Sequence, residues 1–183
     1  KTIELNPEFS KAHMNLGLIC MNLGKLKDSE LSQRKVIELK ADSADAYFNL
    51  SLIELLKGNY ECGLENYEFR FTKRDPIFLY ANVKIEKFNN QTLEKGEKLL
   101  VISEQGLGDT FLYMRYIPYL RSLGLDVSFC APEKLHTLIK ASGIDQNPLT
   151  PEQATLVSEG QWIQLLSLPR YLKVRPENPI ISE

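Results

Sequence analysis

The sequence predicts two kinds of structure in one chain, α-helical repeats followed by an α/β domain, on three observations. Its first part matches itself at an offset of 34 residues. Near Lys98 the pattern changes to an apolar run, a glycine-rich turn and an amphipathic segment. Residues 1–98 contain 15 basic and 15 acidic side chains, whereas residues 99–183 contain 7 and 9. Balanced, dense charge is typical of solvated helical faces, and a sparser, more apolar segment is typical of a buried sheet.

The repeat rests on identities that share one register. Ten residues recur 34 positions later: Lys1, Ile3, Glu4, Leu5, Ala12, Asn15, Leu16, Leu18, Ile19 and Gly24. A fixed period of this length is typical of stacked helix pairs, because one pair alone cannot bury its apolar sides. The alternative is a chance match between two amphipathic helices, and the shared register argues against it.

Each repeat is expected to hold two helices joined at a glycine. Gly24 and Gly58 stand where the first helix must stop and turn, a position that favours a positive φ. Small residues recur where the two helices must approach closely: Gly17, Ser29, Ser51 and Gly63. The expected helices are 10–23, 26–39, 44–57 and 60–71, with residues 1–5 ending an earlier second helix that Pro7 closes.

This pattern resembles the tetratricopeptide repeat, with the end of one repeat and two complete ones in residues 1–72. It departs from the family in Gln33, where an aromatic residue is usual, and in Ala41, where a proline often stands. The resemblance implies that the first helices line a concave surface for a protein or peptide partner. That surface would include Lys11, Met14, Asn15, Leu18 and Met21 in one repeat and Asp45, Phe48, Asn49, Leu52 and Leu55 in the next.

Asn15 and Asn49 are the strongest peptide-binding candidates on that surface. A carboxamide offers a donor and an acceptor, so it can hold the backbone of an extended peptide without reading its sequence. The two match an asparagine ladder in the repeats of the nucleocytoplasmic O-linked N-acetylglucosamine transferases. The alternative, that each asparagine bonds within its own helix pair, stays open.

Aromatic residues are dense between the repeats and the second part of the chain. Seven lie within residues 60–88: Tyr60, Tyr67, Phe69, Phe71, Phe78, Tyr80 and Phe88. Large rings bury much area each, so we expect them to cover the end of the last repeat. A stacking platform for nucleic acid is disfavoured by the neighbouring Glu65, Glu68 and Asp75. Residues 73–97 are therefore expected to form a packed linker.

Residues 98–183 predict a partial α/β domain. Its expected elements are a strand at 99–102, a helix at 109–123 kinked or interrupted by Pro118, a strand at 125–130, a helix at 133–142 and a strand at 162–165. Strand, glycine turn, helix and strand open a doubly wound fold, whose ligands bind at the carboxyl ends of the strands. The expected site therefore lies around residues 104–110.

Known nucleotide motifs do not fit this turn. The dinucleotide fingerprint would need a glycine at Phe111 and an acid near Cys130, and no phosphate-binding P-loop is present. An S-adenosylmethionine site, as in a methyltransferase, is a weaker alternative that uses Glu104, Gly106 and Gly108, with Thr110 in place of its third glycine.

Three ordered motifs resemble bacterial proteins that fuse tetratricopeptide repeats to a heptosyltransferase-like domain of the GT-B fold, whose amino-terminal half is Rossmann-like. They are Glu104-Gln105-Gly106-Leu107-Gly108-Asp109-Thr110, Arg115-Tyr116-Ile117-Pro118 and Leu165-Leu166-Ser167-Leu168-Pro169-Arg170. The resemblance implies that Asp109 is the general base that takes a proton from the acceptor hydroxyl. It also implies substrate binding by Gly106, Leu107, Gly108, Thr110 and Arg115. The alternatives are a helix cap or first-turn acid for Asp109, and a surface arginine for Arg115.

The same resemblance implies what this chain lacks. A GT-B enzyme binds its nucleotide-sugar donor mainly in a second domain, and only 85 residues follow Lys98. We therefore expect a fragment that holds no cofactor and transfers no sugar alone, with a nucleotide-sugar donor bound by the parent chain. The competing class is a protein-interaction scaffold without catalysis.

Composition excludes several partners. A net charge of −2 with no concentrated basic stretch argues against nucleic acid, and no apolar run is long enough to span a membrane. Three widely spaced cysteines, Cys20, Cys62 and Cys130, with two histidines predict neither a metal site nor a disulfide scaffold. They fit a reducing compartment, so a cytoplasmic location is expected.

Overall fold

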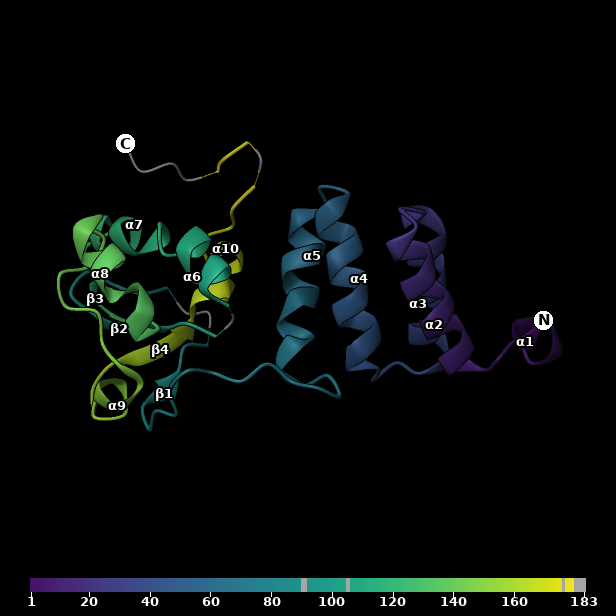
Figure 1. The fold of residues 1–183 in the computed structure, drawn as a ribbon, viewed down its shortest axis with the longest axis horizontal. Coiled ribbons are helices and arrows are strands. Elements are labelled where there is room, and N and C mark those ends of the chain that lie inside the picture. The colour runs from purple at the N-terminus through teal and green to yellow at the C-terminus, as the bar shows by residue number, and fades with distance from the viewer. Residues whose placement is uncertain (90–91, 105, 176, 180–183) are drawn as a thin grey trace. The chain divides into compact units, whose positions relative to one another are not determined.

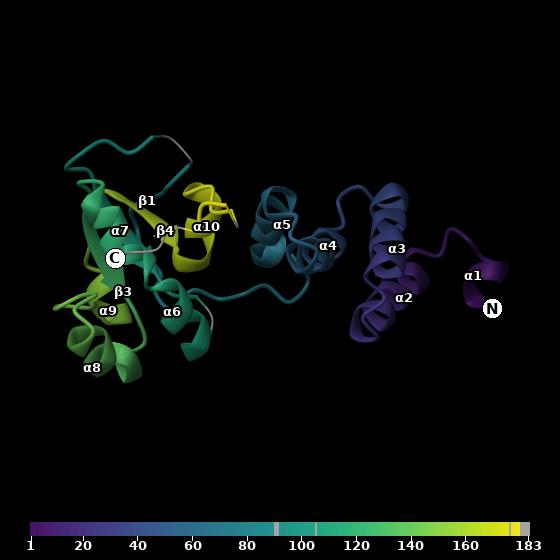
Figure 2. The same ribbon diagram turned by 90° about the horizontal axis from the view of Figure 1, so that it is seen from above.

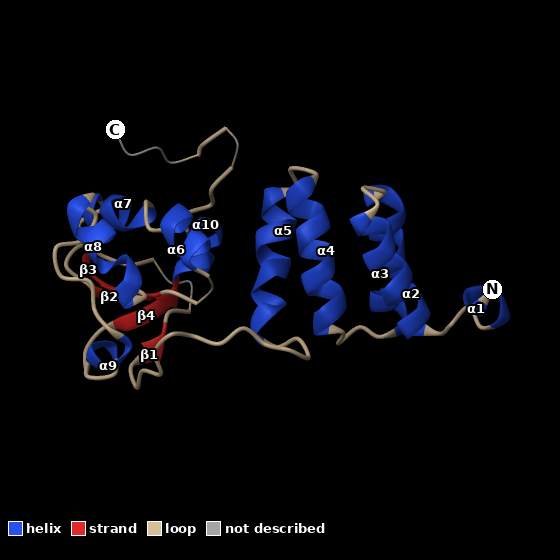
Figure 3. Ribbon diagram, in the orientation of Figure 1, coloured by secondary structure: helices blue, strands red, loops and turns tan. Residues whose placement is uncertain are grey.

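The chain divides into two compact units, Lys1–Pro76 and Ile77–Glu183 (Figure 1). The computed structural model describes residues 1–89, 92–104, 106–175 and 177–179. Helices alone make up the regular structure of the first unit, and strands occur only in the second (Figure 3). The boundary lies after Pro76, whereas the change of pattern in the sequence lies near Lys98.

The first unit consists of antiparallel helix pairs that follow the predicted ranges closely. Its elements are α1 (Thr2–Leu5), α2 (Ser10–Asn22), α3 (Leu26–Leu39), α4 (Ala44–Leu56), α5 (Tyr60–Tyr67) and the 3₁₀ helix η1 (Glu68–Phe71). Helix α2 packs against α3 and α4 packs against α5, with α3 also packed on α4 (Figures 1 and 2). The predicted helix 60–71 is therefore α-helical only to Tyr67 and tightens into a 3₁₀ turn after it.

The turns inside the two repeats have the same geometry. Gly24 and Gly58 have φ values of +71° and +82°, in the left-handed region that favours glycine. The residue after each glycine donates its backbone N–H to a carbonyl five residues back, Lys25 to Cys20 and Asn59 to Glu54, both at 2.8 Å. These bonds satisfy carbonyls at the end of the first helix, as in a Schellman motif. The predicted positive φ at both glycines is confirmed.

Small residues allow close approach between paired helices. Ser29 on α3 is buried and donates its hydroxyl to the backbone oxygen of Gly17 on α2 at 2.7 Å. A Cβ atom at Gly63 would lie 2.9 Å from Cγ of Leu55 on the paired helix, closer than real Cβ atoms come. The predicted small positions therefore lie at the helix contacts.

Gln33 occupies the buried position where the tetratricopeptide pattern usually has an aromatic residue. Its side chain is fully buried, and its amide nitrogen donates to the Met14 backbone oxygen at the long distance of 3.5 Å. Its Oε1 atom is buried, and no described residue donates a hydrogen bond to it. A buried acceptor left unpaired costs free energy, so this position is a weak point in the α2–α3 contact.

Replacing this amide should stabilise the first unit. We expect Gln33→Met to raise the free energy of unfolding by about 1 kcal/mol, because an unbranched apolar chain removes the unpaired acceptor and loses one long hydrogen bond. Hydrogen exchange of the α2 and α3 amides measures the change. Gln33→Glu, which buries a charge at the same place, should do the reverse, and a destabilising Gln33→Met would contradict the argument.

A polar network joins α3, α4 and α5. Glu54 is buried, and its carboxylate accepts from Asn66 Nδ2 at 2.8 Å and from Arg34 Nη2 at 3.4 Å. Arg34 also pairs with Glu30 at 2.9 Å, and Glu30 pairs with Lys57, the C-cap of α4. The Lys57 ammonium, with Arg34, holds the pKa of Glu30 below its ordinary value of 4.5. The network therefore links the second helix of one repeat to both helices of the next.

The lowered pKa of Glu30 predicts a pH-dependent contribution to stability. A carboxylate whose pKa is lower in the folded state stabilises it fully above the ordinary pKa of 4.5, and this stabilisation is lost as the pH falls through the folded value. We expect Glu30→Gln to lower the midpoint of thermal unfolding at pH 7, and the difference from wild type to shrink below pH 4.5. Glu38→Gln removes an exposed pair within one helix and should change little. A difference that is independent of pH would refute this role for Glu30.

The second unit contains a four-stranded parallel sheet in the order β1-β4-β2-β3. Its strands are β1 (Glu86–Lys87), β2 (Lys98–Ile102), β3 (Asp126–Cys130) and β4 (Gln161–Gln164). Its helices are α6 (Leu107–Tyr113), α7 (Tyr116–Ser122), α8 (Glu133–Ala141), α9 (Pro151–Ala154), the 3₁₀ helix η2 (Leu165–Ser167) and α10 (Leu168–Tyr171). After β2 the chain forms β3 on one side of β2 and later β4 on the other side. Because β2 and β4 are parallel neighbours, their carboxyl ends are adjacent.

The predicted helix 109–123 is in fact two helices. The break between α6 and α7 lies at Met114 and Arg115, before Pro118. Pro118 has no N–H to donate to the Met114 oxygen, which accepts from Ile117 at 3.0 Å instead. The proline therefore lies in the first turn of α7, where it is tolerated. The helix is interrupted at Arg115, three residues before Pro118.

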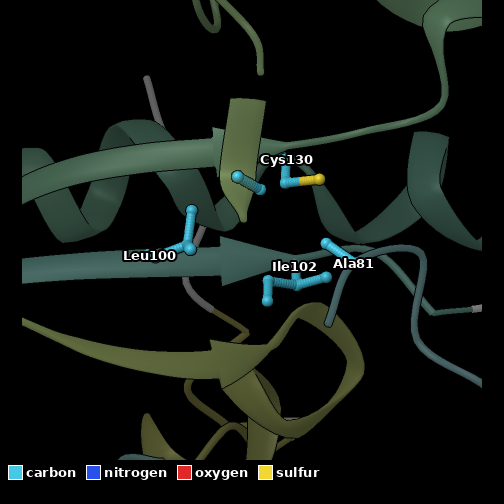
Figure 4. Packing of buried hydrophobic residues seen from close by; sticks show 5 residues of the cluster. Ala81, Leu100, Ile102 and Cys130 are labelled. Carbon is cyan, nitrogen blue, oxygen red and sulfur yellow. The ribbon is translucent and has the colours of Figure 1, made fainter. Parts of the chain in front are cut away.

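An extended segment ahead of β2 covers one face of the sheet. Ala81 packs with Leu100, Ile102 and Cys130, and Ala154 of α9 completes the cluster (Figure 4). The partly buried residues around this cluster are Leu79, Val83, Ile85, Leu149, Val157 and Trp162. Residues 77–97, expected within the linker 73–97, thus belong to the second unit, because their apolar residues alternate along an extended chain and bury one side.

Candidate functional site

Ten side chains on α2 and α4 form the candidate binding surface, which we call the first-helix row. It comprises Lys11, Met14, Asn15, Leu18 and Met21 on α2 and Asp45, Phe48, Asn49, Leu52 and Leu55 on α4. Spacings of three and four residues bring each set to one side of its helix. None of the ten is buried, whereas Gly17 and Cys20 of α2 are buried. The row therefore stays accessible while other sides of the helices form the core.

The two halves of the row meet at Met14 and Asn49. Asn49 Nδ2 donates to the Met14 sulfur at 3.2 Å, across the two first helices. The side chain of Asn15 is exposed and makes no hydrogen bond to another described residue. Neither asparagine bonds within its own helix pair in the described part of the chain, and the Asn49 contact uses one amide donor. Neither side-chain oxygen accepts a hydrogen bond from another described residue.

Aromatic rings and one cation lie beside Phe48 in the row. The Tyr67 ring centroid lies 5.8 Å from that of Phe48, and Lys73 Nζ lies 5.1 Å from the Phe48 centroid. Arg74 donates its backbone N–H to Asp45 at 3.4 Å. The Tyr47 and Phe69 rings stack at 4.4 Å. The Tyr67 and Phe69 rings therefore pack on α4 and leave Phe48 partly accessible beside a positive charge. The expectation that all seven rings cover the last repeat is wrong, because Phe78 is 82% exposed and Phe88 packs against Tyr171 within the second unit.

The glycine turn after β2 opens helix α6, with Gln105 outside the described residues. Gly106 is the N-cap, and Asp109 is the third residue of the helix, so the interpretation of Asp109 as the cap is wrong and the first-turn interpretation holds. Asp109 is half-buried and has no hydrogen-bond or ion-pair partner among the described residues. Gly106, Leu107 and Gly108 are exposed. A half-accessible carboxylate in the first turn of a helix is a stable arrangement without any ligand.

Two other candidates near this turn make local contacts. Thr110 is buried, and its hydroxyl donates to the Gly106 backbone oxygen at 3.2 Å, so it holds the turn. Arg115 is exposed, and its Nη2 donates to the Tyr116 hydroxyl at 3.1 Å. Among the described residues, no hydrogen bond joins Arg115 to Asp109. Thr110 therefore contacts the glycine turn that carries Asp109, whereas Arg115 contacts Tyr116 at the start of α7.

Sequence reasoning missed polar residues buried at the carboxyl ends of β2 and β4. Ser103 and Glu104 follow β2, Gln164 ends β4 opposite Ile102, and all three side chains are buried. Ser103 Oγ and Gln164 Oε1 have no hydrogen-bond partner among the described residues. The polar residues Ser103 and Glu104 directly after the apolar run 99–102 were the available signal.

Metal and thiol chemistry find no support in the described residues. They contain no group of three His, Cys, Asp or Glu side chains placed to hold a metal ion. Burial raises the pKa of the Cys130 thiol to about 12, so it stays protonated at neutral pH and is a poor nucleophile. Likewise, none of the helices described is long and apolar enough to cross a bilayer.

Comparisons with known proteins agree with the geometry of the first unit. Residues 10–43, which contain α2 and α3, match the tetratricopeptide repeat family. Protein FlbA of Caulobacter vibrioides is 31% identical over a segment that covers 69% of this chain and 22% of that protein. The chain thus spans about a fifth of the length of this curated relative. The matched helix pair, its glycine turn and its 34-residue period together identify residues 10–43 as a tetratricopeptide repeat.

Proposed function

We propose that the first unit binds a protein partner by holding an extended peptide segment along the first-helix row. The observation that carries this proposal is the Met14–Asn49 contact, which joins α2 and α4 into one accessible surface. Tetratricopeptide repeats generally bind proteins or peptides, and residues 10–43 are such a repeat.

The chemistry of the row fits a peptide backbone flanked by apolar side chains. Asn15 and Asn49 offer amide donors and acceptors to backbone groups. Met14, Leu18 and Leu52 offer half-buried apolar surface, and the flexible thioether of methionine adapts to different side chains. One cation and one acid, Lys11 and Asp45, leave the row without a dominant charge. We therefore expect anchoring by apolar peptide residues and little selection by net charge.

A displayed library of random peptides, selected on the full chain, tests this function. We expect Leu18→Glu and Leu52→Glu each to weaken the selected peptides about tenfold or more, because a charge then opposes an apolar anchor. Asn49→Ala should weaken peptides of different sequence to a similar extent, since the amide contacts backbone. Calorimetry gives the dissociation constants.

The matched control is Leu31→Glu, which changes an exposed leucine on α3 away from the row. It should leave peptide affinity unchanged. Equal losses from Leu31→Glu and Leu18→Glu, or peptides insensitive to all these changes, would exclude the row as the binding surface.

For the second unit, we propose that it forms the acceptor-binding side of a glycosyltransferase site, with Asp109 as the general base. The specific observation that favours it is the half-accessible Asp109 carboxylate, unpaired among the described residues, in the turn that follows β2. Parallel sheets of this order place ligands beside the carboxyl ends of adjacent central strands, here β2 and β4. A nucleotide-sugar donor would bind elsewhere in a longer protein, so the activity is assigned to that protein as a whole.

This second function is tested in a longer protein that contains the chain. We expect Asp109→Asn to lower turnover of nucleotide-sugars by roughly 10²- to 10⁴-fold, the usual contribution of a general base. Glu133→Gln, another first-turn acid, should leave turnover unchanged. Full activity of Asp109→Asn would remove this residue from catalysis, and no turnover by any variant would favour the interaction scaffold. Calorimetric titration with S-adenosylmethionine tests the methyltransferase alternative.

A further inference from the structure

The exposed side of α6 is entirely apolar. Leu107, Phe111 and Leu112 have 42%, 56% and 52% of their surface exposed, and Gly108 is exposed between them. Leu107 and Phe111 are four residues apart, as are Gly108 and Leu112, so these four residues share one broad side of the helix. We call them the α6 face. Thr110 on the other side is buried, α6 packs on η2, and the described residues leave the α6 face uncovered.

The α6 face adjoins the Asp109 carboxylate. Leu112 follows Asp109 by three residues, a spacing that makes two side chains neighbours on a helix surface. Asp109 is half-buried, so its carboxylate lies at the border between the buried side of α6 and the α6 face. A molecule that places a hydroxyl at Asp109 and extends beyond it along the helix therefore meets apolar surface. Single exposed apolar residues are ordinary, whereas three large ones on one short helix form a patch typical of binding surfaces.

The charge around α6 argues against an anionic acceptor. Asp109 is the one charged residue of α6, and the sequence has no lysine or arginine between Lys98 and Arg115. Phosphate and carboxylate groups are usually recognised by arginine or lysine. Arg115 itself contacts Tyr116, since its Nη2 donates to the Tyr116 hydroxyl and its guanidinium lies 5.1 Å from the ring centroid. The α6 face therefore suits an uncharged, apolar segment that carries a hydroxyl.

We propose that the acceptor of the second unit is a serine or threonine hydroxyl in a protein segment whose flanking apolar side chains pack on the α6 face. This inference rests on the proposed glycosyl transfer. In that transfer the hydroxyl proton passes to the Asp109 carboxylate and the hydroxyl oxygen bonds to the anomeric carbon of the nucleotide-sugar. The bond from that carbon to the nucleotide breaks, and the nucleotide leaves with the bonding electrons. The first-helix row, for which we propose apolar peptide anchors, agrees with a protein acceptor.

The test measures peptide binding without turnover. It uses the full chain with Leu18→Glu and Leu52→Glu, so that the first-helix row does not contribute. The probe is a fluorescent synthetic peptide with one serine between leucine and valine residues and a photoreactive leucine beside the serine. A second peptide has glutamine and asparagine as the flanking residues. We expect the apolar peptide to bind about tenfold or more tightly than the polar one, and its crosslinks, mapped by mass spectrometry, to lie within residues 107–113.

Substitutions in the α6 face separate this surface from general stickiness. Phe111→Gln, alone and with Leu112→Gln, should weaken the apolar peptide, by about tenfold or more in the double variant. The matched control is Leu138→Gln, at a leucine 42% exposed on α8, which should leave the affinity unchanged. Circular dichroism verifies that each variant folds, and the crosslinks of the chain with an intact α6 face give a reading that needs no substitution there. Equal binding of both peptides, an equal loss in the control, or crosslinks outside residues 107–113 would overturn the proposal.

Other occupants of the α6 face give different results. Binding to phosphatidylcholine vesicles that Phe111→Gln abolishes would make a lipid surface the occupant. A dimer in sedimentation that Phe111→Gln dissociates would make a second copy of the chain the occupant. Either result would overturn the proposal.

Failure of this inference is distinguishable from failure of the proposed transfer, because peptide binding needs no nucleotide-sugar. Lower turnover by Asp109→Asn in a longer protein, with no apolar peptide bound at the α6 face, would overturn the apolar protein acceptor alone. Peptide binding at the α6 face together with full activity of Asp109→Asn would remove Asp109 from catalysis and overturn the acceptor role of the bound segment.

Discussion

A short antiparallel helix pair has two apolar sides and can bury only one of them against itself, and the first unit is organised by that constraint. Helix α3 buries apolar surface on two sides, because it packs on α2 within its own repeat and on α4 in the next. Gly24 and Gly58 keep the two pairs in the same geometry by reversing the chain at equivalent points. The accessible first-helix row follows from this stacking, because the sides of α2 and α4 that are not used for packing lie next to each other at Met14 and Asn49.

Polar contacts make the two helix interfaces different in kind. Between α3 and α4, Glu54 is buried under Arg34 and Asn66, an arrangement whose strength depends on every partner being present. Between α2 and α3, Gln33 is buried with one acceptor unsatisfied. The α3–α4 contact therefore depends on matched charges, whereas the α2–α3 contact contains a polar group whose hydrogen bonds are incomplete. The same 34-residue period thus produces two helix interfaces that differ in their polar contacts.

The sequence predicted those parts of the fold whose cause is local. Periodicity located the helices of the first unit, and the apolar run at residues 99–102 with its glycine turn located β2 and α6. Pro118 signalled a break whose position depended on the carbonyl of Met114. The packing of residues 77–85 on the sheet and the burial of Ser103 and Gln164 were not predicted, because they depend on strands distant in the chain. Of the candidate site, the row of residues followed from the repeat, but the Met14–Asn49 contact required the relative placement of two helices.

The cluster formed by Ala81 with Leu100, Ile102 and Cys130 has a practical consequence for dividing this protein. Residues 77–85 form an extended stretch that packs on this face of the sheet. A fragment that contains the sheet must therefore keep this stretch. An expression fragment that starts at Lys98 would lack β1 and would uncover an apolar face of the sheet. The natural boundary for isolating the second unit therefore lies at Pro76, where the helical unit ends and the covering segment begins.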